Sequence, residues 1–182
     1  MFDIMIDIET MSTAQNAVML SVSACYFDKK TGKIGRKFDE QINLKSSFAA
    51  NRDISASTLI WWMEQDDLAR KQFSDNKNAK TMTQVLSLFS EFVDDRSCVW
   101  GNGSSFDLGI LKSAYDKCKI PAPWKFWNER DVRTIVSIGY MLDFNPKKDM
   151  PFVGVRHNAL DDSIHQAKYV SEIFRKLEEQ II

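Results

Sequence analysis

The sequence predicts a mixed α/β domain in which helices pack against a central sheet. Residues 2–44 alternate apolar and polar side chains as strands do, the middle of the chain mixes helical spacing with one short apolar strand, and a long amphipathic stretch begins near residue 159. With 182 residues and no segment that resembles a linker, the chain fits one domain, residues 1–182.

The N-terminal part predicts three strands. Residues 2–10 and 20–28 form the first two, and residues 34–44 alternate again as a third. Between the second and third, residues 29–33 are a polar cluster with a glycine, which is typical of a turn. We therefore expect an antiparallel meander at the start of the domain.

Helical spacing follows in the next part of the chain. Residues 53–63 predict a helix with Ser55 or Ser57 as its N-cap, and residues 64–73 predict a second. From Thr83, apolar residues recur every three or four positions, which indicates an amphipathic helix.

A short strand and three more segments complete the chain. Residues 98–100 suit a buried parallel strand, and a helix should run from Phe106 to just before Pro121. We expect a loop at 120–131, a helix at 132–142, a mobile loop at 144–154 and a last helix from Ala159.

Composition narrows the classes of function. A net charge of −1 argues against a tight, non-specific nucleic-acid binder that relies on a basic surface. The 3 cysteines are odd in number and far apart, which favours reduced thiols in a cytoplasmic protein. No signal peptide and no run of about 18 apolar residues is visible, so we expect no membrane partner.

The run Met5-Ile6-Asp7-Ile8-Glu9-Thr10-Met11 places two acids two residues apart in an apolar strand. Side chains alternate along a strand, so Asp7 and Glu9 project from the same face. Two close carboxylates repel each other unless a cation lies between them, and Mg²⁺ is the usual resident of such a site. The alternative is an edge strand that carries acids for solubility.

A second candidate is Asp107, which follows the apolar strand and the turn Gly101-Asn102-Gly103. An acid at the start of a helix either interacts with the free N–H groups there or acts as a third oxygen ligand. The glycines do not form a phosphate-binding loop, because the Gly-Lys-Ser/Thr element and a third glycine are both missing.

The third candidate is the stretch from His157 to Asp162, after the predicted loop. A histidine titrates near neutral pH and suits a general base, although a lone histidine before a helix is commonly a surface residue. Asp161 and Asp162 also fit a helix start, and His165 is expected to be solvated. Together, four carboxylates and a histidine fit a two-metal centre for phosphodiester hydrolysis.

These motifs resemble a known family. Asp-x-Glu in the first strand, Asn-x-x-x-Phe-Asp in mid-chain and His-x-Ala-x-x-Asp near the end are similar to the DEDDh class of 3′-5′ exonucleases, which have an RNase H-like fold. Trp61-Trp62, residues 126–134 and Met150-Pro151-Phe152 resemble the exonuclease VIII-like branch, with phage-encoded exonuclease A and bacterial 3′-5′ exoribonucleases. The resemblance extends from residue 3 to about residue 175.

The resemblance implies roles for individual residues. Two Mg²⁺ or Mn²⁺ ions would be held by Asp7, Glu9, Asp107 and Asp162, and His157 would be the general base. The family pattern selects Asp162 over Asp161, because its acid lies five residues after the histidine. The implied reaction removes nucleoside 5′-monophosphates from single-stranded or frayed 3′ ends.

Substrate contacts are implied by the same resemblance. Phe106 would pack on the terminal base, and the terminal nucleotide would be held at Ile8, Thr10, Met11 and Asn102. Trp62 would stack on a second base, although a tryptophan pair in an apolar helix is more often core. Five basic residues lie near the site in sequence and either contact phosphates or form a solvated face: Arg130, Arg133, Lys147, Lys148 and Arg156.

The sequence leaves three alternatives open. The natural substrate is DNA or RNA, because the 2′-hydroxyl that separates them is recognised by geometry that the sequence does not show. The chain is alternatively a catalytically idle nucleic-acid-binding module of the same fold, or a hydrolase of small phosphoesters. Some relatives are homodimers, which favours a homodimer here.

Overall fold

The computed structural model describes residues 3–74 and 76–181, and within this part of the chain five strands form one sheet. The order is β3-β2-β1-β4-β5, with β1 antiparallel to β2, β2 antiparallel to β3, and β4 and β5 parallel to β1. The predicted meander and the buried parallel strand are confirmed. The strands are β1 (Asp3–Thr10), β2 (Met19–Phe27), β3 (Ile34–Gln41), β4 (Cys98–Gly101) and β5 (Glu129–Asp131).

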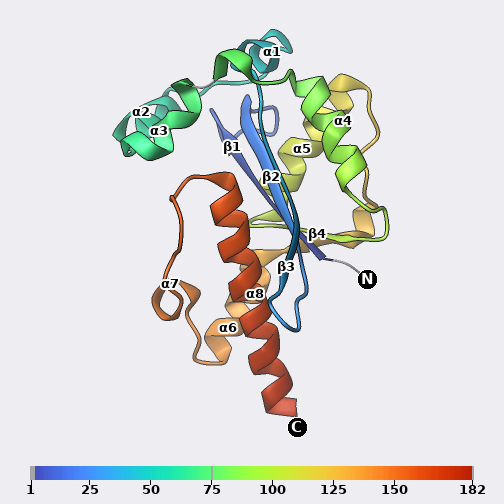
Figure 1. The fold of residues 1–182 in the computed structure, drawn as a ribbon, viewed down its shortest axis with the longest axis vertical. Coiled ribbons are helices and arrows are strands. Elements are labelled where there is room, and N and C mark those ends of the chain that lie inside the picture. The colour runs from blue at the N-terminus through green and yellow to red at the C-terminus, as the bar shows by residue number, and fades with distance from the viewer. Residues whose placement is uncertain (1–2, 75, 182) are drawn as a thin grey trace.

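Helices cover both faces of this sheet, and α1 to α3 lie at one end of it (Figure 1). One face packs against α4 and α5, and the other against α6 and α8. None of the helices in the described ranges has the length and apolar character needed to cross a membrane. The helices are α1 (Leu44–Ala49), α2 (Ala56–Glu64), α3 (Asp67–Ser74), α4 (Met82–Phe92), α5 (Ser104–Cys118), α6 (Val132–Met141), α7 (Pro146–Asp149) and α8 (Ala159–Ile181).

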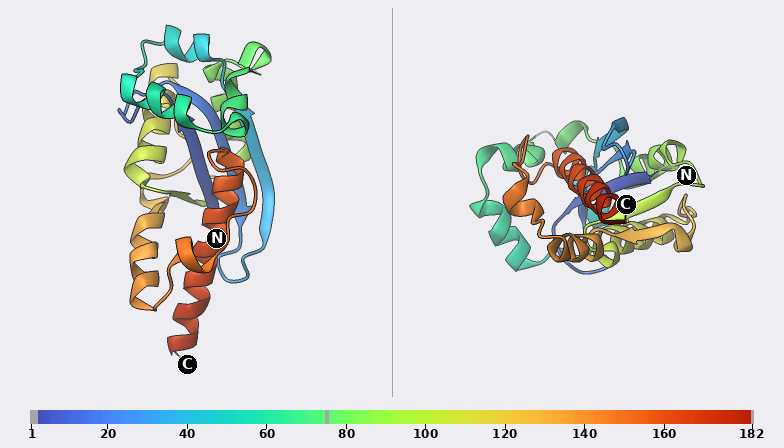
Figure 2. Two further views of the ribbon diagram at one scale, coloured as in Figure 1. Left: turned by 90° about the vertical axis from the view of Figure 1, so that its left-hand side faces the viewer. Right: turned by 90° about the horizontal axis from the view of Figure 1, so that it is seen from below.

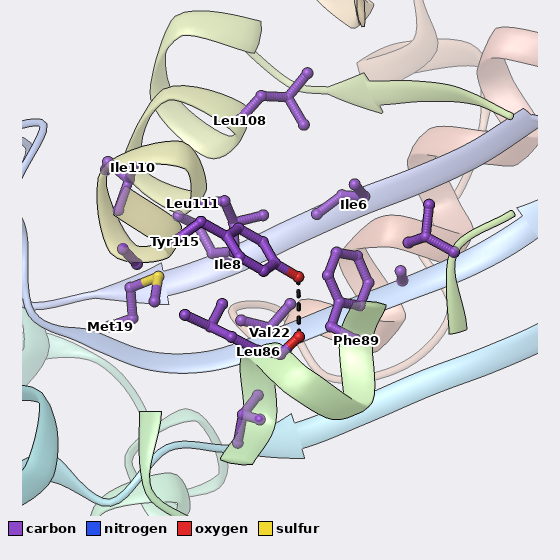
Figure 3. Close-up of a cluster of buried hydrophobic side chains, with 14 of the residues drawn as sticks. Ile6, Ile8, Met19, Val22, Leu86, Phe89, Leu108, Ile110, Leu111 and Tyr115 are labelled. Atoms are coloured by element: carbon purple, nitrogen blue, oxygen red, sulfur yellow. Dashed lines mark hydrogen bonds between the residues drawn. The ribbon is translucent and has the colours of Figure 1, made fainter. Parts of the chain in front are cut away.

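The side chains of β1 point alternately into two cores, one on each face of the sheet. Ile6 and Ile8 point into the core shared with α4 and α5 (Figure 3), and Ile4 belongs to the same core. Met5 points into the opposite core, which is shared with α8. Asp7 lies on the same face as Met5, because the side-chain period of a strand is two. The acids of β1 therefore face the layer that contains α8.

Polar side chains fix where α2 and α5 begin. Ser55, and not Ser57, caps α2 by accepting the Thr58 N–H. Gly103 provides no cap for α5, so the Asp131 carboxylate accepts the Ser104 N–H at 2.6 Å. The same carboxylate caps α6. Asp131 lies far along the chain in β5, so the sequence around Phe106 does not show this cap. Helix α5 therefore starts at Ser104, two residues before the predicted start.

Three short elements differ from the predictions. The third strand ends at Gln41 rather than at residue 44, because the Asn43 side chain caps α1. Strand β5 lies within the predicted loop 120–131. It is held by its pairing with β4 and has no hydrophobic pattern that would predict a strand. Helix α7 lies within the predicted loop 144–154, where Asn145 caps a single turn that opens with Pro146.

Candidate active site

Four acidic side chains from three distant elements meet beside β1. Asp7 and Glu9 project from β1 towards α8, Asp107 lies in the first turn of α5, and Asp162 lies in the first turn of α8. The start of α8 lies against the sheet, near α2 and α3 (Figure 2). The fold thus brings together the predicted acids of all three motifs.

Burial and mutual repulsion change the acidity of this cluster. The pKa of Asp7 is raised well above its usual value by burial, then by the charges of Asp107 and Asp162. Burial and the charge of Asp7 do the same to the pKa of Glu9. Burial raises the pKa of Asp107 to about 7 and also raises the pKa of Asp162. Without a cation, the cluster therefore retains protons that an exposed carboxylate would release.

His157 lies next to two of these acids. One potential ligand atom from each of His157, Glu9 and Asp162 lies within 4.8 Å of the other two. The His157 backbone adopts a left-handed conformation with φ of 62°, and its N–H donates to Asp162 Oδ2 at 2.8 Å. This turn connects the loop to α8 and places the imidazole at the acid cluster.

The two neighbouring acids of α8 have different positions. Asp162 belongs to the cluster, whereas Asp161 Oδ2 accepts the Val155 N–H at 2.8 Å. A Cβ atom added at Gly154 would lie 2.5 Å from the Asp161 carboxyl carbon. Asp161 therefore fastens the preceding loop to α8, as the choice of Asp162 for the site requires.

Gln166 was not predicted and contacts the site directly. Its Nε2 donates to Asp7 Oδ1 at 2.8 Å, and the side chain is buried. Its Oε1 has no hydrogen-bond partner among the described residues. Gln166 follows Asp162 by four positions in α8, so the two share one helix face. That spacing is the sequence signal that would have identified it.

The donor set suits a divalent cation. Asp107 Oδ2 is buried and has no hydrogen-bond partner in the described part of the chain. A buried, unpaired carboxylate oxygen is costly, and coordination of a cation removes that cost. Carboxylate oxygens are the ligands that Mg²⁺ and Mn²⁺ prefer. The four acids therefore fit the metal-binding role predicted for them.

The two tryptophans have different surroundings, and Trp62 takes the core position that the sequence favoured over stacking on a base. Trp62 is only 2% exposed and its Nε1 donates to the Thr10 carbonyl at 2.9 Å, so it stabilises the end of β1 and does not reach a base in this structure. Trp61 is 38% exposed, and its ring lies edge-on to the His157 imidazole with centroids 4.8 Å apart. Because Trp61 and Trp62 are neighbours in one apolar helix, the sequence did not show which of them is buried in the core and which lies at the site.

The other predicted contact residues are mostly buried. Ile8, Thr10 and Met11 are each at most 6% exposed, which leaves mainly their backbone available to a nucleotide. Phe106 and Asn102 are half-buried.

His165 differs from the prediction that it is solvated. It is half-buried between Phe152 and Tyr169, and burial lowers its pKa.

Known proteins are similar to this chain in sequence and in architecture. A family model described as "3'-5' exoribonuclease Rv2179c-like domain" matches residues 2–174. The exodeoxyribonuclease of Enterobacteria phage T4 is 27% identical over 198 residues, which cover 91% of this chain and 84% of the phage protein.

Solved structures show the same fold at low sequence identity. The nuclease domain of 3'hExo, a DEDDh family member bound to rAMP, has a TM-score of 0.59 at 14% identity, covering 98% of this chain and 92% of that domain. E. coli exonuclease I in complex with a dT13 oligonucleotide has a TM-score of 0.70 at 9% identity, covering 99% of this chain and 42% of that protein. The predicted RNase H-like fold is confirmed. Because the family model spans nearly the whole sequence, the chain belongs to the 3′-5′ exoribonuclease Rv2179c-like domain family and is a 3′-5′ exonuclease.

Proposed function

We propose that the chain hydrolyses the last phosphodiester bond of single-stranded 3′ ends and releases nucleoside 5′-monophosphates. The observation that supports this most is a cluster beside β1 of four carboxylates, each with a raised pKa, in which Glu9 and Asp162 lie next to His157. A buried cluster of this kind is typical of phosphodiester hydrolysis with two cations.

In this proposal Asp7, Glu9, Asp107 and Asp162 hold two Mg²⁺ ions, for which Mn²⁺ substitutes. When bound, the ions supply Lewis-acid stabilisation of the attacking and leaving oxygens. Gln166 keeps the Asp7 carboxylate in one orientation through its hydrogen bond.

His157 acts as the general base. Its imidazole takes a proton from the attacking water, the new P–O bond forms, and the bond to the 3′ oxygen of the preceding nucleotide breaks. The edge of Trp61 restricts the rotation of the ring. The terminal nucleotide is held at the backbone of Ile8, Thr10 and Met11 and beside Phe106 and Asn102.

The test uses a single-stranded oligonucleotide labelled at its 3′ or its 5′ end, with Mg²⁺, Mn²⁺ or chelator. We expect immediate loss of the 3′ label, a descending ladder from the 5′-labelled strand, and no cleavage in chelator. Absence of cleavage with either metal would favour the idle binding module. Equal cleavage of a nitrophenyl nucleotide ester at the same concentration would favour a small-phosphoester hydrolase.

Two neighbouring substitutions provide the matched control. Asp162→Asn removes a proposed ligand and should abolish cleavage. Asp161→Asn keeps an oxygen that accepts the Val155 N–H and should leave cleavage unchanged. If both variants lost activity at unchanged stability, the assignment of Asp162 rather than Asp161 to the site would be wrong.

Substrate sugar and assembly complete the proposal. The matching family is described as an exoribonuclease domain and the phage relative as an exodeoxyribonuclease. The test therefore compares kcat/KM for RNA and DNA oligonucleotides of the same sequence. We also propose a homodimer, from the resemblance to a class with homodimeric members. Light scattering tests it, because a homodimer has twice the mass of one chain.

A further inference from the structure

Two clefts open beside the acid cluster, one lined by residues just before and at the start of α8 and the other by residues of its first turns. One has a volume of about 360 Å³ and is lined by β2, β3, α3 and the residues around His157. The other has a volume of about 630 Å³ and lies between α6, α7, the loop at 150–156 and α8. We call the second the α6–α8 cleft. Asn102, Asp162 and Gln166 line its inner end, so it opens directly onto the proposed site.

The α6–α8 cleft contains three cationic side chains, from three different segments. Arg133 comes from α6, Lys147 from α7 and Arg156 from the loop before His157. Within the described residues, none of the three lies within 4 Å of a carboxylate, whereas Lys112 and Lys80 pair with glutamates at 2.9 and 2.8 Å. The smaller cleft, by contrast, combines Asp39 with Lys71. Arg133 and Arg156 act only at longer range, on Asp107 and Asp162 of the site. Positive charge without a close carboxylate is therefore concentrated in the α6–α8 cleft.

Positive charge in this cleft does not merely balance the acids once the proposed ions are bound. Four carboxylates carry four negative charges, and two divalent cations cancel them. The charges of Arg133, Lys147 and Arg156 then remain in excess. A phosphodiester backbone is the polyanion that such a row of cations attracts.

Local packing holds two of these cations in position. A Cβ atom added at Gly103 would lie 3.1 Å from Arg133 Cζ, and φ of 103° at Gly103 disfavours any side chain there. The Arg156 guanidinium lies over the Phe152 ring, 4.9 Å from its centroid. Tyr140, which is 52% exposed, adds a second aromatic surface to the cleft. Cations combined with aromatic rings are typical of grooves that bind single strands.

We propose that the α6–α8 cleft binds the backbone of the single strand on the 5′ side of the scissile bond. This inference rests on the proposed function, which assigns the terminal nucleotide to the end of β1 and leaves the cleft to the preceding nucleotides. Bases stack on the aromatic rings without regard to sequence, and the three cations contact successive phosphates.

The experiment compares Lys147→Gln with Lys148→Gln. Both residues belong to α7 and are exposed, but only Lys147 lines the cleft. Fluorescence anisotropy of a labelled octanucleotide whose last linkage is non-hydrolysable measures affinity with Mg²⁺ present, over a range of salt concentrations. We expect Lys147→Gln to weaken binding severalfold and to reduce the slope of log K against log salt by about 0.7, the value for one phosphate contact on a single strand. Lys148→Gln should match wild type.

A second measurement separates this cleft from the catalytic site. Hydrolysis of a nitrophenyl nucleotide ester, which has no upstream backbone, should be the same for Lys147→Gln and wild type. Equal effects of the two lysine variants on octanucleotide binding, or equal effects of Lys147→Gln on ester and octanucleotide, would overturn the proposal. Failure of the proposed function would instead appear as wild-type inactivity with metal on the ordinary oligonucleotide, which leaves the binding comparison valid.

Discussion

The substitution Asp107→Asn should stabilise the metal-free protein at alkaline pH while it abolishes metal-dependent cleavage. Asp107 is 3% exposed, and burial raises its pKa from 3.8 to about 7. One pKa unit corresponds to about 1.4 kcal/mol, so ionisation of this buried group costs about 4 kcal/mol of the free energy of unfolding. Asparagine keeps the shape and an acceptor oxygen but carries no charge.

The direction of the pH dependence follows from the raised pKa. Between pH 4 and 7 the native state holds a proton that the unfolded state has released, so the free energy of unfolding falls as pH rises through this range. The variant lacks this contribution. We expect nearly equal stability at pH 4 and a variant more stable by up to about 4 kcal/mol at pH 8, or about 8–16 °C in Tm.

The assay is urea or thermal unfolding in chelator at pH 4, 6 and 8, followed by the same series with Mg²⁺. Mg²⁺ should raise the Tm of wild type at pH 8 more than that of the variant, because ligands that bind only the native state stabilise it. Parallel curves for wild type and variant from pH 4 to 8 would refute the assignment of Asp107 as a buried, strained carboxylate.

Three further substitutions test the neighbours of the site. Gln166→Leu removes the hydrogen bond to Asp7 and should weaken Mn²⁺ binding about 10–100-fold by calorimetry, with an unchanged Kd arguing against its positioning role. Trp62→Ala leaves a buried cavity and an unpaired Thr10 carbonyl, so urea unfolding should show a loss of about 3–5 kcal/mol. Trp61→Ala should lower kcat with less than about 1 kcal/mol of lost stability, and a larger loss of stability than for Trp62→Ala would reverse their assigned roles.

The sequence predicted the elements that have a strong period. In strand β1 the side chains follow a period of two, and in helices α4 and α8 apolar residues recur every three or four positions, and the structure confirms all three elements. Short elements such as β5 and α7 depend on pairing with β4 or on a single cap, and three or four residues have no period to detect.

The candidate site shows a similar division. The acids and His157 were predicted because their spacing matches a family pattern. The structure places His157 beside Glu9 and Asp162, and the charges of Asp7 and Asp107 act on the same cluster. Gln166 was missed because an amide is not a typical metal ligand, although its spacing of four residues from Asp162 places both on one helix face. Trp61 and Trp62 are neighbours in one helix, and only the packing of α2 against the end of β1 shows which one is buried.

The hydrogen bond between Gln166 and Asp7 joins residues 159 positions apart, and Asp162 likewise comes from the last helix. A ribosome adds about 5–20 residues per second, so about 8–30 s pass between the synthesis of β1 and that of the first turns of α8. Until then the nascent chain contains β1 with its two acids but neither the fourth carboxylate nor the amide that orients Asp7. A nuclease assembled in this order lacks a complete acid cluster until α8 has been synthesised.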